Sequence, residues 1–380
     1  MSEYVRKIEN DSTLLSTRLA DLDIELTERC NNDCIHCCIN LPSDDAAARL
    51  REMETEHVKD ILCQAADLGC LQVRYTGGEP LLRPDFEELY LFARNLGLKV
   101  LVFTNARCIT ARLAGLFARV PPLVPIEITV YGMHEQSYEA VTRSRGSFVQ
   151  FRRGVELLLE HSVPFVVKGA LLPPNRDELG EFEAWAQTIP AMERRPGLSM
   201  FYELRSRRDD EAKNELIRSL RVSPEEGLKI VRRDEARFCQ EMGEFRTKFM
   251  GMPDDRLFTC GAGHGLSIDA YGIAQPCLGL RAPQLTMDTQ VSSLAEVLDR
   301  FVSLRGLRAT NPDYLRRCAR CFLKDLCEQC PARSWSEHGT LDTPVEYYCE
   351  VVHAQARFLG WLAEGEMAWK VKKSRNVVDE

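Results

Sequence analysis

Residues 27–37 read Thr27-Glu28-Arg29-Cys30-Asn31-Asn32-Asp33-Cys34-Ile35-His36-Cys37 and directly follow an alternating apolar run, Leu22 to Leu26. Three thiols within eight residues can converge on one metal centre, and an all-sulfur ligand set favours zinc, copper(I) or an iron–sulfur cluster. Structural zinc sites usually contain C-x2-C pairs that add up to four ligands, whereas this spacing is C-x3-C-x2-C with no fourth partner at similar range. A four-iron cluster held by Cys30, Cys34 and Cys37 leaves one iron open.

This stretch resembles the radical S-adenosylmethionine (SAM) superfamily, whose signature is the C-x3-C-x2-C loop after the first strand of a partial barrel. The resemblance implies that the open iron of a [4Fe–4S] cluster binds the amino and carboxylate groups of SAM. One electron from the cluster then cleaves the sulfonium to give a 5′-deoxyadenosyl radical, which removes a hydrogen atom from the substrate. The alternatives are a zinc loop and thiols that are simply buried in a core.

The length, charge and composition of the chain exclude several classes of protein. A length of 380 residues with 44% hydrophobic residues predicts two globular domains. The formal net charge of −8 does not suggest nucleic acid as a main partner. No secretory signal and no apolar run of membrane-spanning length is visible, so we expect a cytoplasmic protein without membrane contact. Fifteen cysteines in that compartment favour metal ligation over disulfides.

Short apolar runs alternate with amphipathic helices over the first half of the chain. The expected strands cover residues 22–26, 71–75, 99–103, 126–130, 165–171 and 198–202. This alternation predicts a parallel sheet, and six units are too few for a closed eight-stranded barrel. The expected fold class is therefore α/β, with an open partial (β/α)6 barrel, which is also what the resemblance implies. A further resemblance, carried by the cysteines from Cys260 onward, implies a small cysteine-rich iron–sulfur domain after the barrel.

Parallel α/β sheets gather ligands at the carboxyl ends of their strands. Thr76-Gly77-Gly78-Glu79-Pro80 stands at the end of the second expected strand and resembles the Gly-Gly-Glu-Pro motif of the family. By that resemblance, its backbone and a carboxylate receive the amino group of SAM. A glycine pair before a proline is otherwise an ordinary turn.

Two further motifs extend the resemblance. Thr104-Asn105-Ala106 resembles the Thr-Asn-Gly of the family, and Ile128-Thr129-Val130-Tyr131-Gly132 is similar to its strand-four motif. The resemblance implies that Asn105 and Thr129 contact SAM and that Arg143 or Arg145 pairs with the SAM carboxylate. Surface ion pairing is an equal interpretation of the two arginines.

A second group of cysteines begins late in the chain and comprises Cys260, Cys277, Cys318, Cys321, Cys327, Cys330 and Cys349. This pattern resembles the SPASM domain, named for maturases of subtilosin, pyrroloquinoline quinone, anaerobic sulfatases and mycofactocin. The resemblance implies two auxiliary [4Fe–4S] clusters. Cys318, Cys321, Cys327 and Cys349 would hold the outer one, and Cys260, Cys277 and Cys330 the inner one.

The inner cluster lacks one cysteine ligand. Residues 252–256, where relatives place the missing thiol, contain none. The inner cluster therefore has an open iron or uses Asp254, Asp255 or the distant Cys239. Of the remaining cysteines, Cys63, Cys70 and Cys108 are expected to be core thiols, and Cys38 is awkwardly placed to share a cluster with its neighbour Cys37.

These resemblances predict five segments: an N-terminal extension (1–20), a radical SAM core (21–205), a helical linker (206–255), a SPASM domain (256–352) and a C-terminal helix or tail (353–380). They imply an enzyme that modifies a peptide or protein substrate, because most SPASM relatives act on ribosomally made peptides. They also imply a low-potential electron donor such as flavodoxin or ferredoxin. About twenty residues precede the first strand, so we expect a separate leader-peptide-binding protein or leader-free recognition.

Three alternatives stay open. A sulfatase-maturing enzyme forms formylglycine with an aspartate directly after the cysteine of the Gly-x4-Cys motif, whereas Leu278 follows Cys277 here. A second alternative is a radical SAM enzyme that acts on a small metabolite, including the haem-tailoring members. The third is an iron–sulfur redox sensor without enzyme activity, which would leave the motif from Gly77 to Pro80 unexplained.

Overall fold

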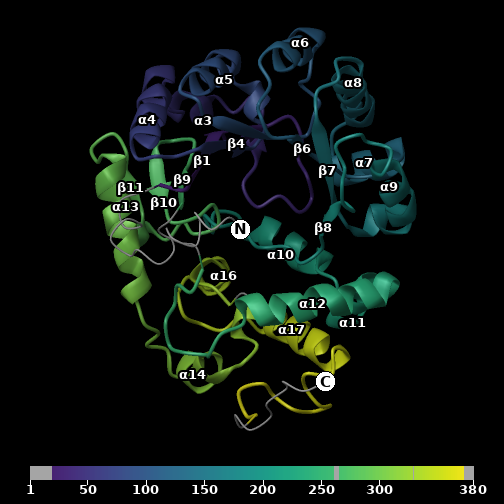
Figure 1. Ribbon diagram of the computed structural model, residues 1–380, viewed down its shortest axis with the longest axis vertical. Coiled ribbons are helices and arrows are strands. Elements are labelled where there is room, and N and C mark those ends of the chain that lie inside the picture. Colours follow the sequence, from purple (N-terminus) through teal and green to yellow (C-terminus); the bar gives the residue numbers. More distant parts are fainter. Residues whose placement is uncertain (1–18, 261–264, 328, 372–380) are drawn as a thin grey trace. The chain divides into compact units, whose positions relative to one another are not determined.

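The computed structural model describes residues 19–260, 265–327 and 329–371 (Figure 1). Contacts between residues divide the chain into two compact units. The first consists of Met1–Leu220 with Gly261–Ser303, and the second of Arg221–Cys260 with Leu304–Glu380. In the described parts of the chain, no helix combines the length and the hydropathy needed to cross a bilayer.

Six parallel strands form the centre of the first unit. They are β1 (Asp21–Thr27), β4 (Gln72–Gly77), β5 (Lys99–Thr104), β6 (Ile126–Val130), β7 (Phe165–Ala170) and β8 (Gly197–Ser199), paired in this order. The expected open (β/α)6 arrangement is confirmed. The last strand was expected to continue to residue 202 but ends at Ser199. Beyond it, the Tyr202 hydroxyl donates to the carbonyl oxygens of Leu171 and Ser199, at 2.8 and 2.9 Å.

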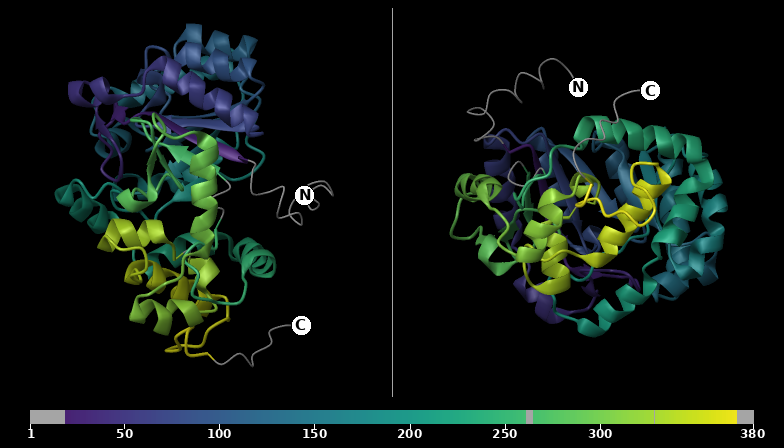
Figure 2. Two further views of the ribbon diagram at one scale, coloured as in Figure 1. Left: turned by 90° about the vertical axis from the view of Figure 1, so that its left-hand side faces the viewer. Right: turned by 90° about the horizontal axis from the view of Figure 1, so that it is seen from below.

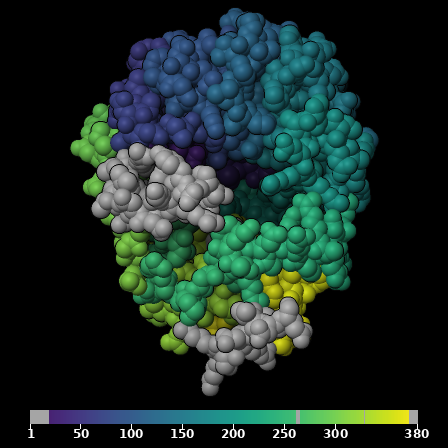
Figure 3. Space-filling view, in the orientation of Figure 1, coloured from purple at the N-terminus to yellow at the C-terminus, as the bar shows by residue number. Residues whose placement is uncertain are grey.

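Amphipathic helices cover the outside of these strands. They are α3 (Ala46–Arg51), α4 (Thr55–Asp67), α5 (Phe86–Asn95), α6 (Ala111–Arg119), α7 (Glu135–Thr142), α8 (Ser147–Glu160) and α9 (Leu179–Ala186). Their apolar faces are buried, as at Val58, Ile61 and Leu62 of α4. Figure 2 shows the helices outside the strands, and Figure 3 shows α4 and α5 as part of the purple-to-blue surface of this unit. α10 (Glu211–Leu220) instead shares an apolar cluster with Ile35 of the cysteine loop.

Three further strands extend the sheet beyond β1. They are β9 (Gly265–Ile268), β10 (Ile273–Gln275) and β11 (Met287–Asp288), followed by α13 (Leu294–Val302), which packs on α4. β9 is parallel to β1, and β10 is antiparallel to both of its neighbours. An uncovered β1 would expose a row of unpaired backbone groups. Part of the segment expected to be a separate cysteine-rich domain therefore completes the sheet of the first unit.

The second unit is built mainly from short helices. They are α11 (Pro224–Val231), α12 (Glu235–Phe249), α14 (Pro312–Arg316), α15 (Lys324–Cys327), α16 (Pro331–His338) and α17 (Glu346–Phe358). Its apolar cluster includes Leu323, Val352 and Ala356, with Trp361 and Trp369 packed against it. The segment 206–255, expected to be a helical linker, is helical, but α10 belongs to the first unit while α11 and α12 belong to the second.

Candidate functional site

The cysteine loop is fixed at both ends in the first unit. β2 (Arg29–Cys30) pairs with β3 (Leu41–Pro42), which brings the two ends of the loop together. The amide of Asp33 donates to Thr142 O at 2.9 Å and that of Ile35 to Val141 O at 3.0 Å, anchoring the middle of the loop to the end of α7. As a result, the three loop cysteines line one cavity of about 450 Å³, namely Cys30, Cys34 and Cys37.

Gly77 and Gly78 line the same cavity and lie against the start of the cysteine loop. A Cβ atom at Gly77 would be 2.1 Å from Thr27 O, and one at Gly78 would be 2.2 Å from Arg29 O. The amide of Gly78 donates to Thr27 O at 2.7 Å, and the backbone of Gly77 has a φ of +124°. Any side chain here would separate the two loops, so the glycine pair is more than an ordinary turn.

Glu79 lies behind the cavity wall. Its fully buried carboxylate accepts hydrogen bonds from the Thr104 hydroxyl and the Asn105 amide, both at 2.8 Å, and from the Leu81 amide at 3.2 Å. Burial raises the pKa of Glu79 to about 7, against the opposing effect of these bonds. In the structure this carboxylate joins the glycine loop to the end of β5, and neither Glu79 nor Pro80 is among the residues that line the cavity.

The structure separates the other predicted SAM-binding residues into two groups. Asn105 and Thr129 line the cavity, and the side-chain Nδ2 of Asn105 donates to Asn31 Oδ1 at 2.7 Å. Arg143 lies outside it at the end of α7, in the left-handed backbone region. Its exposed guanidinium is 3.4 Å from the Asp33 carboxylate, which is the ion pair that the sequence left as the alternative. Arg145 is likewise exposed and does not line the cavity.

Aromatic residues that the sequence did not single out surround the loop. His36 contacts Tyr202 and Tyr131, with ring centres 4.9 and 5.8 Å apart, and all three line the cavity. Burial, and then the charge of Lys213, lower the pKa of His36 to about 4, so the ring is neutral at pH 7. His36 Nδ1 and Asn32 Nδ2 are buried and have no hydrogen-bond partner among the described residues. They leave two polar atoms available to a bound group.

Lys168 was also missed, because a single lysine in an apolar strand carries no recognisable pattern. Its ammonium lies in the barrel, 3.1 Å from Glu127 Oε2 and 3.5 Å from the centre of the Phe103 ring. Burial lowers its pKa, against the effect of Glu127. Among the described residues that line the cavity, Lys168 carries a basic side chain and Glu203 an acidic one.

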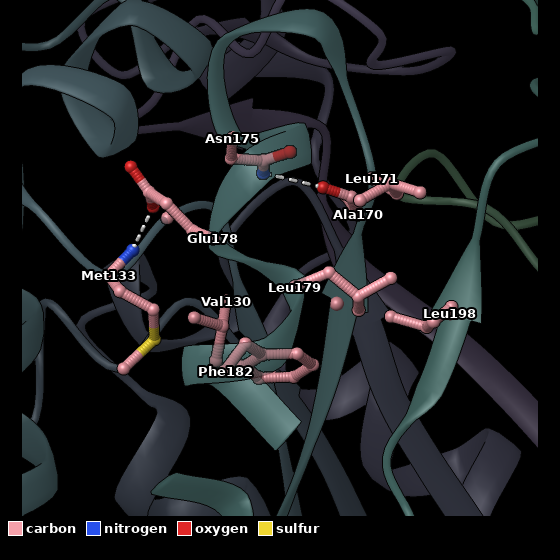
Figure 4. A pocket seen from close by; sticks show the side chains of 11 residues that line it. Val130, Met133, Ala170, Leu171, Asn175, Glu178, Leu179, Phe182 and Leu198 are labelled. Atoms are coloured by element: carbon pink, nitrogen blue, oxygen red, sulfur yellow. Dashed lines mark hydrogen bonds between the residues drawn. The ribbon is translucent and has the colours of Figure 1, made fainter. Parts of the chain in front are cut away.

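A small pocket behind β6 and β7 shows how the cavity wall is supported (Figure 4). The Asn175 side-chain amide donates to Ala170 O and Tyr131 O, both at 2.7 Å, and Glu178 accepts from the Met133 amide at 2.6 Å. These bonds fix the carboxyl ends of both strands. The pocket, of about 20 Å³, has room for little more than a water molecule.

The loop cysteines have the donor chemistry of an iron–sulfur site. Burial raises the pKa of Cys34 above its usual range, so a thiolate at this position needs a bound cation. Sulfur ligands favour soft metals and iron–sulfur clusters. Within the described ranges, no three His, Cys, Asp or Glu side chains converge closely enough for a single metal ion. A four-iron cluster spaces its thiolates more widely, because each binds a different iron.

In the second unit, four cysteines line another cavity: Cys318, Cys321, Cys327 and Cys349. This is the predicted outer set. The predicted inner set is divided, since Cys277 belongs to the first unit while Cys260 and Cys330 belong to the second.

The other candidate ligands of the inner cluster are paired with cationic side chains or lie at the surface. Asp254 pairs with Lys324 at 3.1 Å and also with Arg256, and Asp255 pairs with Arg308. Cys239 is exposed on α12. Cys108, expected in the core, accepts a hydrogen bond from Asn31 of the cysteine loop at 3.3 Å, while Cys70 is buried as expected.

Comparisons with known proteins agree with this geometry. A family model described as the Radical SAM superfamily matches residues 24–186. The chain is 24% identical over 335 residues to an AdoMet-dependent heme synthase of Methanosarcina barkeri, covering 83% of this chain and 92% of that protein. It is 33% identical over 165 residues to the mycofactocin maturase MftC of Mycolicibacterium smegmatis, covering 43% of this chain and 40% of that protein.

The fold is also similar to that of solved structures. Streptococcus suis SuiB bound to S-adenosylmethionine gives a TM-score of 0.62 at 15% identity, covering 91% of this chain and 78% of that one. SuiB has also been solved with its precursor peptide SuiA. The C-x3-C-x2-C loop at the carboxyl end of β1, the barrel and the family match all lead to one assignment. The chain contains a radical SAM domain, which spans residues 24–186.

Proposed function

We propose that this chain is an enzyme that reductively cleaves SAM and uses the 5′-deoxyadenosyl radical to remove a hydrogen atom from a peptide. The observation that carries the proposal is the convergence of Cys30, Cys34 and Cys37 with the backbone of Gly77 and Gly78 on one cavity. When bound, a [4Fe–4S] cluster supplies the electron that cleaves the sulfonium of SAM.

The chain's own residues have distinct roles in this proposal. Cys30, Cys34 and Cys37 hold the cluster, and the side-chain-free backbone of Gly77 and Gly78 receives the amino group of SAM. Asn105 and Thr129 present an amide and a hydroxyl to the same ligand. Glu79 acts one layer further out, by holding the glycine loop to β5. Arg143 has no part in this assignment, because its guanidinium pairs with Asp33 outside the cavity.

The proposed substrate is a ribosomally made peptide. MftC is named as a maturase, and SuiB has been solved with a precursor peptide. The cavity of about 450 Å³ is in the usual size range of a small-molecule site, so a peptide would insert one or two side chains beside SAM. Lys168 offers an ammonium donor to an oxygen atom of that side chain. We also propose that flavodoxin or ferredoxin is the electron donor and that a separate protein binds the leader peptide. The proposed location is the cytoplasm.

Two auxiliary clusters form part of the proposal. Cys318, Cys321, Cys327 and Cys349 would hold the outer one within a SPASM domain spanning residues 256–352. Cys260, Cys277 and Cys330 would hold the inner one. Asp254 and Asp255 are already paired with cationic side chains. We therefore propose that neither aspartate closes the inner cluster and that one of its irons is open to a substrate donor group.

A second candidate function is chemistry on a tetrapyrrole. It is favoured by the match to the heme synthase, which extends over 83% of this chain. In this case Lys168 would face a carboxylate of the small molecule instead of a peptide side chain. Formylglycine formation has less support, because Leu278 cannot take a proton from the substrate.

The deciding experiment gives the anaerobically reconstituted enzyme SAM and dithionite, together with peptides encoded beside its gene, a tetrapyrrole carboxylate or a sulfatase-motif peptide. We expect 5′-deoxyadenosine above the substrate-free level, and a change of mass, only with a neighbouring peptide. Stimulation by the tetrapyrrole alone would favour the second candidate, and a mass loss matching formylglycine would show the Leu278 argument to be wrong.

Two variants locate the chemistry within the chain. Cys30→Ala should abolish formation of 5′-deoxyadenosine, whereas Cys239→Ala, which removes an exposed thiol on α12, should leave it unchanged. Full iron loading of the wild type without SAM cleavage under several reductants would instead support a redox sensor.

A further inference from the structure

Arg317 lies beside the four cysteines of the outer set. Its Nη2 atom is 3.7 Å from Cys349 Sγ, and its side chain lines the cavity that the four cysteines form. Its Nε atom is buried and has no hydrogen-bond partner among the described residues. A buried donor without a partner is costly, so a group bound in this cavity would give Nε–H an acceptor.

Neighbouring side chains hold the guanidinium in place. Arg317 Nη2 is 2.8 Å from Glu346 Oε2, and Nη1 is 3.2 Å from Asp313 Oδ2. The guanidinium carbon is 4.7 Å from the centre of the Trp369 ring, which lines the same cavity. The Arg317 side chain is 14% exposed. Since the cation is already oriented, little conformational entropy is lost when it bonds to a further group.

The other polar groups around the cavity have their donors occupied. The Lys324 ammonium donates to Asp254 O, Asp254 Oδ1 and Arg256 O, at 2.9, 3.1 and 2.7 Å, which accounts for its three hydrogens. His353 Nε2 accepts from the Ala368 amide at 3.2 Å, so Nδ1 carries the ring hydrogen and donates it to Cys349 O at 2.7 Å.

We propose that Arg317 is a positioning residue that stabilises the reduced form of the outer cluster and so raises its reduction potential. The inference rests on the proposed function insofar as the four cysteines must hold a [4Fe–4S] cluster. Reduction adds one electron to the cluster, supplied by an external reductant, with no proton and no bond change in Arg317. The reduced cluster carries one more negative charge, so a fixed cation and N–H···S bonds favour it over the oxidised form.

A redox titration of the anaerobically reconstituted full chain, followed by electron paramagnetic resonance, tests this. The outer-cluster signal is identified as the one that Cys318→Ala removes. Arg317→Gln, which removes the charge, should titrate at a lower potential than the wild type. Arg317→Lys, which keeps the charge but not the planar fork, should fall between the two.

The chain supplies a matched control in the next residue. Arg316→Gln also removes one positive charge, but the Arg316 side chain is 73% exposed and pairs with Asp313, so the potential should stay at the wild-type value. Equal potentials in wild type and Arg317→Gln, with the cluster loaded in both, would overturn the proposal. So would loss of the cluster in Arg317→Gln together with a wild-type potential in Arg317→Lys, because Arg317 would then be purely structural. A wild type with no signal sensitive to Cys318→Ala would refute the outer cluster itself.

Discussion

The carboxylate of Glu79 lies wholly inside the protein, between the glycine loop and the end of β5. Its pKa of about 7 is above the ordinary value of 4.5, so the folded chain binds this proton more tightly than the unfolded chain. The contribution of Glu79 to stability is therefore largest below about pH 4.5 and is lost as the pH rises towards 7.

Glu79→Gln should remove this pH dependence, because an amide does not titrate in that range. The free energy of unfolding of the variant relative to the wild type should rise between pH 4.5 and pH 8 by up to roughly 3 kcal/mol. Urea unfolding at the two pH values measures it. Glu56→Gln, at a side chain that is 81% exposed, should show no such change. A difference between Glu79→Gln and wild type that is the same at both pH values would mean that Glu79 titrates normally.

Residue type alone identifies some members of the site and not others. The spacing of the cysteines and the glycine pair can be recognised in the sequence. The structure brings these residues to one cavity, namely Cys30, Cys34, Cys37, Gly77 and Gly78. His36 lies within the cysteine loop, but its low pKa results from burial, and the two tyrosines that contact its ring come from distant segments. The importance of Lys168 and Arg317 likewise depends on which side chains surround them, and no spacing in the sequence encodes that.

Among the elements, the addition of β9 to β1 is the main feature that the sequence did not predict. The six barrel strands could be predicted, because each is a short apolar run between helices with apolar stripes. β9 and β10 are equally short, but their assignment to the barrel sheet depends on pairing across most of the chain, and local patterns do not specify this.

A buried ion cluster secures this added segment. Arg281 Nη2 donates to both carboxylate oxygens of Glu25, at 2.6 and 2.7 Å, and Nη1 to Glu28 at 3.1 Å. Asp269 lies 3.7 Å from the same guanidinium, and Arg207 pairs with Glu28 and Asp269. Three buried carboxylates thus share two arginines, so losing one arginine leaves charge without compensation.

Arg281→Met should destabilise the first unit by about 3–5 kcal/mol, the usual cost of removing one partner from a buried ion pair. Thermal or urea unfolding monitored within that unit measures the loss. Arg112→Met is the control, because that side chain is 80% exposed and its pair with Glu87 should contribute less than about 1 kcal/mol. Similar stability for the two variants would contradict the electrostatic role of the cluster.

For the whole molecule, the proposed clusters predict an iron content. The reconstituted protein should hold about twelve irons, and simultaneous replacement of Cys30, Cys34 and Cys37 by alanine should lower this by about four. Iron and labile-sulfide assays on both proteins give the numbers, with Cys239→Ala as the control. Stoichiometric zinc without labile sulfide would contradict the cluster assignment at every cysteine set.

The pairing of β9 with β1 also determines the order in which the chain can fold. The Ser267 hydroxyl reaches Asp23 across 244 positions of sequence, at 3.2 Å. During synthesis from the N-terminus, the edge of β1 therefore waits for its partner until the ribosome has made the whole barrel and the first helices of the second unit. Contacts of such long range form late and slowly. A nascent chain that stops at Leu220 would carry an open sheet edge, and such edges are prone to aggregate, so this protein depends on finishing its synthesis before its first unit is complete.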